Sequence, residues 1–179
     1  MPDIVIIGII FNPVLARFEI MQYYCIMVYV KEAAGILKRH GYRITAPRKT
    51  VIGVLGEAEG PLSPYDIQKC LRANDNSLNH VTIYRILDLL CSLDLVHRVI
   101  TAGGFMRCTL VNKKGCHRHM ICRSCGSVTE FADESLCEKE DAVVRQLGFY
   151  AEHHITEFLG LCSSCYDSEN GGVDEANPR

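Results

Sequence analysis

Two Cys-x-x-Cys pairs in the last third of the chain place the tightest constraint on its fold. Cys122-Arg-Ser-Cys125 and Cys162-Ser-Ser-Cys165 each set two thiols on a tight turn. A tetrahedral zinc ion takes four thiolates at about 2.3 Å, and two such turns supply them. We therefore predict one structural zinc per chain, held by these four cysteines. It would join the last strand of its domain to the first and contribute directly to folding.

The ten cysteines of the 179-residue chain also bear on its compartment. In a secreted protein they would indicate disulfides, but the start of the chain lacks a secretory signal pattern, and the paired spacing is typical of metal ligation. We therefore expect a cytoplasmic protein that is not an enzyme and has no catalytic residues. A thiol oxidoreductase remains the alternative from another class, although no thioredoxin-like βαβ pattern surrounds either pair.

Residues 1–30 form an apolar N-terminal extension of undetermined role. Its two apolar runs, Ile4 to Phe11 and Ile20 to Val30, are separated by Asn12-Pro13 and two charged residues. Neither run reaches the roughly 18–20 residues that a membrane-spanning helix needs, so we expect no membrane partner. The remaining interpretations are an extra helix or strand that packs on the body, or upstream sequence that does not belong to the reading frame.

Residues 31–111 have the pattern of a winged helix-turn-helix. A helical segment after Lys31 ends at Gly41, and three further helices are expected to begin near Thr45, Ser63 and Leu78. The hydrophobic period then changes to two, in segments 95–100 and 105–111 on either side of a Gly-containing turn. That change predicts a β-hairpin after the helices.

Residues 112–166 are expected to form a small α+β domain, so the fold class is α+β. The pattern predicts strands at 119–122, 127–131 and 150–159, a helix at 136–147, and a loose polar tail at 167–179. Charge is unevenly distributed, with a balance of +3 over residues 31–100 and −4 over residues 101–179. A basic half followed by an acidic half fits a DNA-reading module joined to a second domain.

Three motifs together resemble the ferric-uptake-regulator (Fur) superfamily of metalloregulators. They are His117-x-His119-Met-Ile-Cys122-x-x-Cys125 with Gly160-Leu-Cys162-x-x-Cys165, Gly41 to Arg48, and Val81 to Leu87, which is similar to the family's recognition helix. The resemblance covers about residues 31–166. It implies an N-terminal winged helix for DNA binding and a C-terminal dimerisation domain. It also implies a metal-loaded homodimer that binds a palindromic operator in double-stranded DNA.

A regulatory metal site is expected at the junction of the two domains. We predict that His97, Cys108, His117 and His119 hold it, since residues 117 and 119 share one face of a strand. One thiolate with three imidazoles suits zinc better than ferrous iron. The pattern resembles the zinc-uptake-regulator (Zur) branch, which implies a zinc-responsive repressor of zinc-acquisition genes. An iron- or peroxide-responsive repressor, with ferrous iron as the regulatory metal, is the alternative within the family.

A further metal site found in many family members is altered in this sequence. Cys116 and Arg118 occupy positions where the family commonly has histidines. We nevertheless expect that Glu130, His153 and His154 can form part of such a site. Cys116 is either a substitute ligand or a spare thiol.

The expected DNA contacts lie on the helix predicted to begin near Leu78 and on the one predicted to begin near Thr45. Arg85 can bond a guanine edge with two hydrogen bonds, and the Tyr84 ring can pack on a thymine methyl group. Thr82, Arg48 and Lys49 are expected to contact phosphates, which positions the helix without specifying sequence. The alternative for Tyr84 is a place in the core, because Ile83 and Leu87 already mark a buried stripe.

Overall fold

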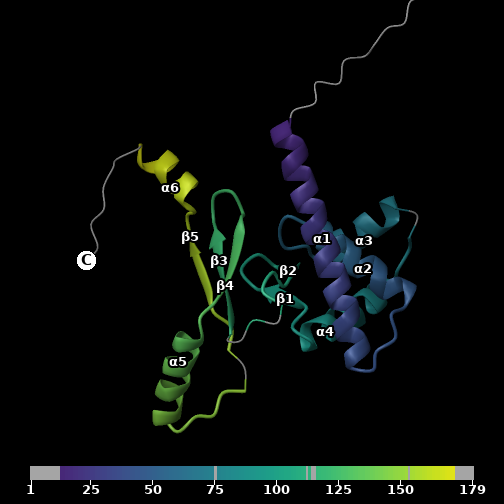
Figure 1. The fold of residues 1–179 in the computed structure, drawn as a ribbon. Coiled ribbons are helices and arrows are strands. Elements are labelled where there is room, and N and C mark those ends of the chain that lie inside the picture. Colours follow the sequence, from purple (N-terminus) through teal and green to yellow (C-terminus); the bar gives the residue numbers. More distant parts are fainter. Residues whose placement is uncertain (1–12, 75, 112, 114–115, 153, 172–179) are drawn as a thin grey trace, which may run out of the picture.

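The computed structural model places a helical part and a sheet part side by side (Figure 1). Residues 13–107 form four helices and a two-stranded hairpin, and residues 117–170 form a three-stranded sheet with two helices. The fold class is therefore α+β, as predicted. The structure describes residues 13–74, 76–111, 113, 116–152 and 154–171.

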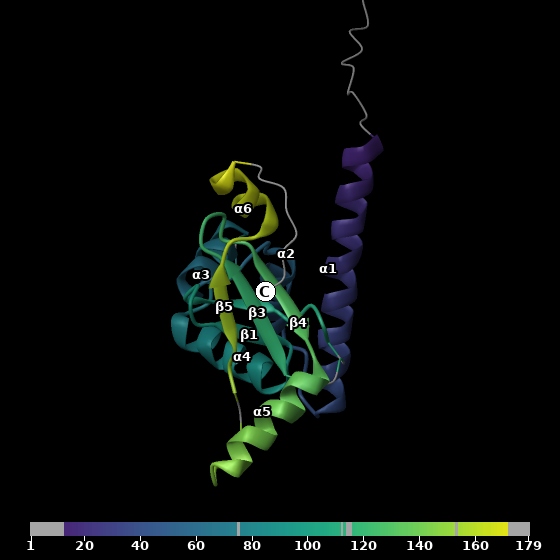
Figure 2. The ribbon, with the colours of Figure 1, turned by 90° about the vertical axis from the view of Figure 1, so that its left-hand side faces the viewer.

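Helix α1, Pro13–Arg39, passes through the boundary that the sequence pattern suggested at residue 30. Tyr29 lies on one side of that boundary and Leu37 on the other, and both belong to the same buried core. The Tyr29 hydroxyl donates a hydrogen bond to the Leu95 carbonyl at 3.0 Å, which connects α1 to the segment before the hairpin. Residues 13–30 thus continue the first helix, and Figure 2 shows α1 as one long rod beside the rest of the molecule. Among the described residues, no helix combines the length and the apolar character that crossing a membrane requires.

We expect Tyr29→Phe to lower the free energy of unfolding by about 1–2 kcal/mol, because the Leu95 carbonyl loses a buried donor. Tyr29→Ala also removes the ring from the core and should cost about 3–5 kcal/mol. Urea unfolding measures both, with Tyr24→Phe as the control because Tyr24 is 67% exposed on the same helix. Tyr29→Ala with unchanged stability would mean that this turn of α1 contributes nothing to the core.

The next three helices begin where the capping residues predicted. They are α2 (Ala46–Glu57), α3 (Pro64–Ala73) and α4 (His80–Ser92). Ser63 and Asp66 form a reciprocal capping box at α3, and the Asn79 side chain accepts a hydrogen bond from the Thr82 backbone at 2.8 Å. Thr45 precedes α2 with extended backbone angles but makes no side-chain capping bond. Apolar residues from all four helices fill one core.

The predicted hairpin consists of β1, Val96–Val99, and β2, Gly104–Arg107. The two strands pair antiparallel. On the other side of β2, Leu62 forms an isolated antiparallel bridge with Phe105 through two backbone hydrogen bonds of 2.9 and 2.8 Å. A Cβ atom on Gly104 would lie 2.9 Å from Pro61 Cβ and 3.0 Å from the Leu62 backbone. Glycine is therefore required where the hairpin approaches this edge, and each strand is shorter than the sequence pattern suggested.

The second part is a sheet in the order β4-β3-β5. Its strands are β3 (His117–Cys122), β4 (Val128–Ala132) and β5 (Glu157–Gly160). Its helices are α5 (Glu134–Gln146) and α6 (Ser163–Asn170). β3 pairs antiparallel with β4 and parallel with β5. Two predicted boundaries differ from the structure. The strand expected at 150–159 is reduced to β5, and the tail expected to be loose from 167 begins inside α6.

Candidate metal centres

The four cysteines of the two Cys-x-x-Cys pairs converge at one end of the sheet. β3 and β5 are parallel neighbours, so the turns that follow them meet at the same edge. Cys122 ends β3, and Cys162 caps α6 just after β5. All four sulfur atoms lie within 4.8 Å of one another, and Cys125 Sγ is 3.8 Å from Cys162 Sγ.

Backbone N–H groups make this cluster suitable for a cation. Those of Cys125 and Cys162 point at the Cys122 sulfur and lower the pKa of that thiol to about 6. Thiolate is the form that binds metal. Gly126, with φ of 74°, turns the chain so that Cys122 and Cys125 face the same point. Four sulfur donors at this spacing fit a tetrahedral zinc ion and leave no open coordination position.

A second cluster lies where the helical part meets the sheet. It contains His97 on β1, Cys108 after β2, His117 on β3 and Glu130 on β4. The Nδ1 atom of His117 lies 2.9 Å from His97 Nε2 and 3.4 Å from Cys108 Sγ. Each part of the molecule contributes two of the four ligand atoms, which all lie within 4.8 Å of one another.

Glu130 is the buried carboxylate of this second cluster, with a side chain that is 0% exposed. Its Oε1 atom lies 3.0 Å from His97 Nε2 and 2.8 Å from His117 Nδ1, while Oε2 accepts two hydrogen bonds from Thr109. Burial alone raises the pKa of Glu130, but hydrogen bonds from His97 and Thr109 outweigh it and lower the pKa to about 2. Burial and the nearby Glu130 raise the pKa of the Cys108 thiol. A cation at this place would favour the ionised form of both groups, since the four ligand atoms lie within 4.8 Å of one another.

His119 lies beside this cluster but outside the group of mutually close ligand atoms. It pairs with Glu130 across β3 and β4, and its ring centroid is 5.4 Å from that of His97. The side chain is buried, and its Nε2 atom has no hydrogen-bond partner among the described residues. Burial, and then the neighbouring His97, lower the pKa of His119.

The predicted sensor residues thus come together with one difference. His97, Cys108 and His117 converge as expected, and Glu130 takes the fourth place in the group, where His119 was predicted. The prediction had placed Glu130 in a different metal site. Only the pairing of β3 with β4 brings Glu130 to this point, and the sequence gives no direct signal of that register.

Of the other residues predicted for a further site, the structure describes only His154, and it does not lie in the group that contains Glu130. His154 lies with Cys116 and Cys137, where the three ligand atoms are within 4.8 Å of one another. His153 lies outside the described residues. Glu130 belongs to the second cluster, and within the described residues His154 belongs to a different group from Glu130.

The residues predicted to contact DNA lie on α2 and α4. Tyr84 is 49% exposed and Arg85 is exposed, whereas Ile83 and Leu87 on the same helix are buried. Tyr84 is therefore a surface residue and not part of the core. Near the start of α2, Lys49 is exposed, and the Arg48 guanidinium lies 5.6 Å from the centre of the Tyr42 ring. Thr82 is half-buried in the first turn of α4.

Comparison with known proteins adds a family to this geometry. A model described as "Ferric uptake regulator family" matches residues 39–159. The zinc uptake regulation protein of Escherichia coli is 29% identical over 139 residues, which cover 77% of this chain and 81% of that protein. The peroxide operon regulator of Bacillus subtilis is 30% identical over 141 residues, with coverage of 79% and 96%. A solved zinc uptake regulator in complex with zinc and DNA has a TM-score of 0.75 and 27% identity, covering 81% of this chain and 97% of its own.

Proposed function

The chain belongs to the ferric uptake regulator family, and on that premise we propose that it is a zinc-responsive transcriptional repressor. It would bind palindromic operator DNA as a metal-loaded homodimer and control zinc-acquisition genes. The observation that carries this proposal is the Cys108 sulfur in the cluster that both parts of the molecule share. Sulfur is a soft ligand that favours zinc over ferrous iron. The likeness to a zinc uptake regulator solved with zinc and DNA gives further support.

We infer two zinc ions per chain with different roles. The four-cysteine cluster would hold a structural ion, and the cluster of His97, Cys108, His117 and Glu130 would hold the regulatory one. Four-thiolate binding would occupy both Cys-x-x-Cys pairs, so we assign these cysteines no catalytic role. Residues 31–111, extended by α1, would serve as the DNA-binding domain and residues 112–166 as the dimerisation domain.

Zinc bound by His97, Cys108, His117 and Glu130 would control how the two domains are oriented. Bound zinc would supply the positive charge that the buried carboxylate and thiol lack. His97 and Cys108 would then be held against His117 and Glu130, which fixes the angle between domains. A second contact also joins the two domains. The Glu157 carboxylate on β5 accepts hydrogen bonds from the backbone N–H groups of Ile100 and Thr101, in the turn of the hairpin, at 2.6 and 2.8 Å.

In a two-fold dimer this angle sets the spacing of the two α4 helices. The helices must match successive major grooves, which are about 34 Å apart. Zinc favours the DNA-competent orientation only through its differential affinity for that state, and a coupling of about 1–3 kcal/mol changes DNA affinity roughly 5- to 150-fold.

An exposed apolar face on the second domain supports the homodimer. Among the described residues, neither α5 nor α6 contains a buried side chain. Large apolar residues on and before β5 are between 51% and 79% exposed, and they are Phe149, Tyr150, Ile155, Phe158 and Leu159. So many large exposed apolar side chains in one small domain are typical of a surface that another molecule covers. A second copy of the same domain would cover it.

We expect Arg85→Ala to weaken binding to a specific operator by about 1–3 kcal/mol and to relax specificity at the contacted base pair. Lys49→Ala should weaken binding equally across DNA sequences. It should also reduce the slope of log affinity against log salt concentration by about one, because one phosphate contact is lost. Fluorescence anisotropy at several salt concentrations measures both effects. Lys139→Ala on α5 is the matched control, because it removes one positive charge far from α4. Equal losses from Arg85→Ala and Lys139→Ala would contradict the assignment of α4 as the reading helix.

Selection from a random pool of double-stranded DNA tests the proposed function as a whole. Zinc-loaded protein is expected to enrich palindromic sequences whose half-sites lie about one helical turn apart. The same protein with its regulatory zinc chelated should enrich these sequences much more weakly, since zinc is expected to raise DNA affinity by about 5- to 150-fold. Zinc-independent enrichment would contradict the metal-responsive repressor, and failure to enrich any sequence would contradict DNA recognition.

A further inference from the structure

A third group of side chains surrounds two thiols beside the second metal cluster. Cys116 directly precedes β3, and Cys137 lies in the first half of α5. The Cys116 backbone N–H donates a hydrogen bond to Cys137 Sγ at 2.9 Å, and the two sulfur atoms are within 4.8 Å of each other. His154 Nδ1 lies 3.6 Å from Cys116 Sγ.

A buried arginine decides what chemistry suits this group. Arg118 is 0% exposed, its Nη1 atom lies 3.6 Å from Cys137 Sγ, and its Nη2 atom pairs with Glu140 Oε2 at 2.5 Å. A guanidinium in a protein stays protonated, so a positive charge, paired with Glu140 through its other nitrogen, lies against the Cys137 sulfur. That charge favours a thiolate and opposes a metal cation at the same place. The Glu140 oxygen that Arg118 uses, Oε2, is also 3.3 Å from His154 Nε2.

We propose that Cys137 and Cys116 form a peroxide-oxidisable dithiol, with Cys137 as the reacting thiolate and Cys116 as the resolving thiol. The Cys137 sulfur attacks a hydroperoxide oxygen, the O–O bond breaks, and a sulfenic acid and hydroxide form. The Cys116 sulfur then attacks the Cys137 sulfur and displaces the second hydroxide, which leaves as water with the Cys116 proton. In total, two thiols and one hydrogen peroxide give one disulfide and two water molecules.

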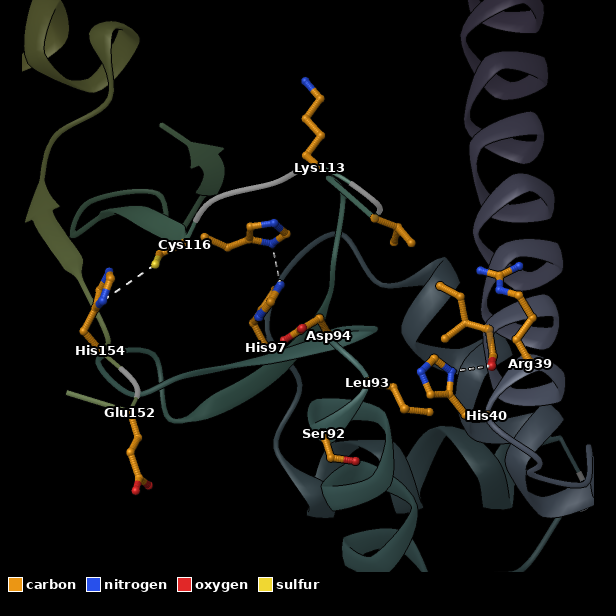
Figure 3. Close-up of a pocket in the computed structure, with 13 residues that line it drawn as sticks. Arg39, His40, Ser92, Leu93, Asp94, His97, Lys113, Cys116, Glu152 and His154 are labelled. Atoms are coloured by element: carbon orange, nitrogen blue, oxygen red, sulfur yellow. Dashed lines mark hydrogen bonds between the residues drawn. The ribbon is translucent and has the colours of Figure 1, made fainter. Parts of the chain in front are cut away.

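Beside this pair, in which Cys137 is half-buried, lies a cavity of about 600 Å³ between the two domains. Cys116 and His154 line it, together with His97 and His117 of the second metal cluster. Figure 3 shows the Cys116 and His154 side chains facing each other in this cavity. Because Cys116 directly precedes His117, a Cys116–Cys137 bridge would tie the strand that carries a proposed metal ligand to α5. The thiol chemistry itself does not depend on the proposed repressor function.

The test is peroxide treatment of the full chain with zinc loaded, followed by alkylation of free thiols and peptide mass spectrometry. One equivalent of hydrogen peroxide is expected to produce the Cys116–Cys137 bridge, at a rate about tenfold or more above modification of Cys70, a half-buried thiol on α3. In Cys116→Ser, Cys137 should stop at the sulfenic acid, which dimedone traps. In Cys137→Ser, Cys116 should stay reduced, while Cys70→Ser should leave the bridge unchanged.

Two results would overturn the proposal. One is oxidation that spreads over the other cysteines without a Cys116–Cys137 bridge in the wild-type protein. The other is a zinc content that falls by one ion per chain in Cys137→Ser with the remaining thiols intact, since that would make the group a metal site. Neither result depends on DNA binding, so each can be separated from a failure of the repressor proposal.

Discussion

Replacing Cys162 with serine is expected to remove one zinc ion per chain and to unfold the second domain. Structural zinc sites of this kind have apparent binding free energies of about 10–16 kcal/mol at neutral pH. Whole domains are stable by only about 5–15 kcal/mol. The second domain has little else to hold it together, because its buried cluster contains only Val99, Met106 and Ile121 among the described residues, and two of these belong to the hairpin.

Zinc analysis, far-UV circular dichroism and thermal unfolding measure this effect. The helical domain should keep its own transition, because its larger core lies in α1 to α4. Cys70→Ser is the matched control, since it removes a thiol that lies outside the zinc clusters. A Cys162→Ser protein that kept both zinc content and melting temperature would show that the four-cysteine cluster does not hold a structural ion.

Replacing Glu130 with glutamine is expected to abolish most of the zinc-dependent gain in operator affinity, which we place at roughly 5- to 150-fold. The substitution keeps the shape of the side chain but removes the charge that faces His97 and His117. His119→Gln should have a smaller effect, because His119 lies outside the set of mutually close ligand atoms. The pair of variants therefore distinguishes Glu130 from His119 as the fourth ligand.

Anisotropy with labelled operator DNA at buffered zinc concentrations measures the gain in each variant. Binding without regulatory zinc should be the same in both variants and in the wild type, which controls for damage to the DNA-binding surface. A larger loss in His119→Gln than in Glu130→Gln would restore the ligand set expected from the sequence pattern.

Local features of the fold could be predicted because local residues determine them. Ser63 and Asn79 mark helix starts through their own side-chain hydrogen bonds, and Gly41 marks a helix end with φ of 78°. The four-cysteine cluster could be predicted for the same reason, since each of its two cysteine pairs lies within four consecutive residues.

Features that depend on pairing between distant segments were harder to predict. Glu130 reaches the second cluster only through the register of β4 against β3, and Cys137 reaches Cys116 only through the placement of α5. The length of α1 was missed for a different reason. Its apolar residues before Lys31 include both the buried Tyr29 and the exposed Met27, so no clean helical stripe appears there.

The central claim is that zinc at the junction of the two domains is the signal for DNA binding. The most direct test uses purified dimer with its four-cysteine zinc in place and a palindromic operator from a zinc-transporter promoter. DNA binding is followed while buffered zinc and, separately, anaerobic ferrous iron are added. We predict a response to zinc at far lower free metal than to iron. A response to iron alone would contradict the zinc assignment and identify an iron-responsive regulator with the same fold.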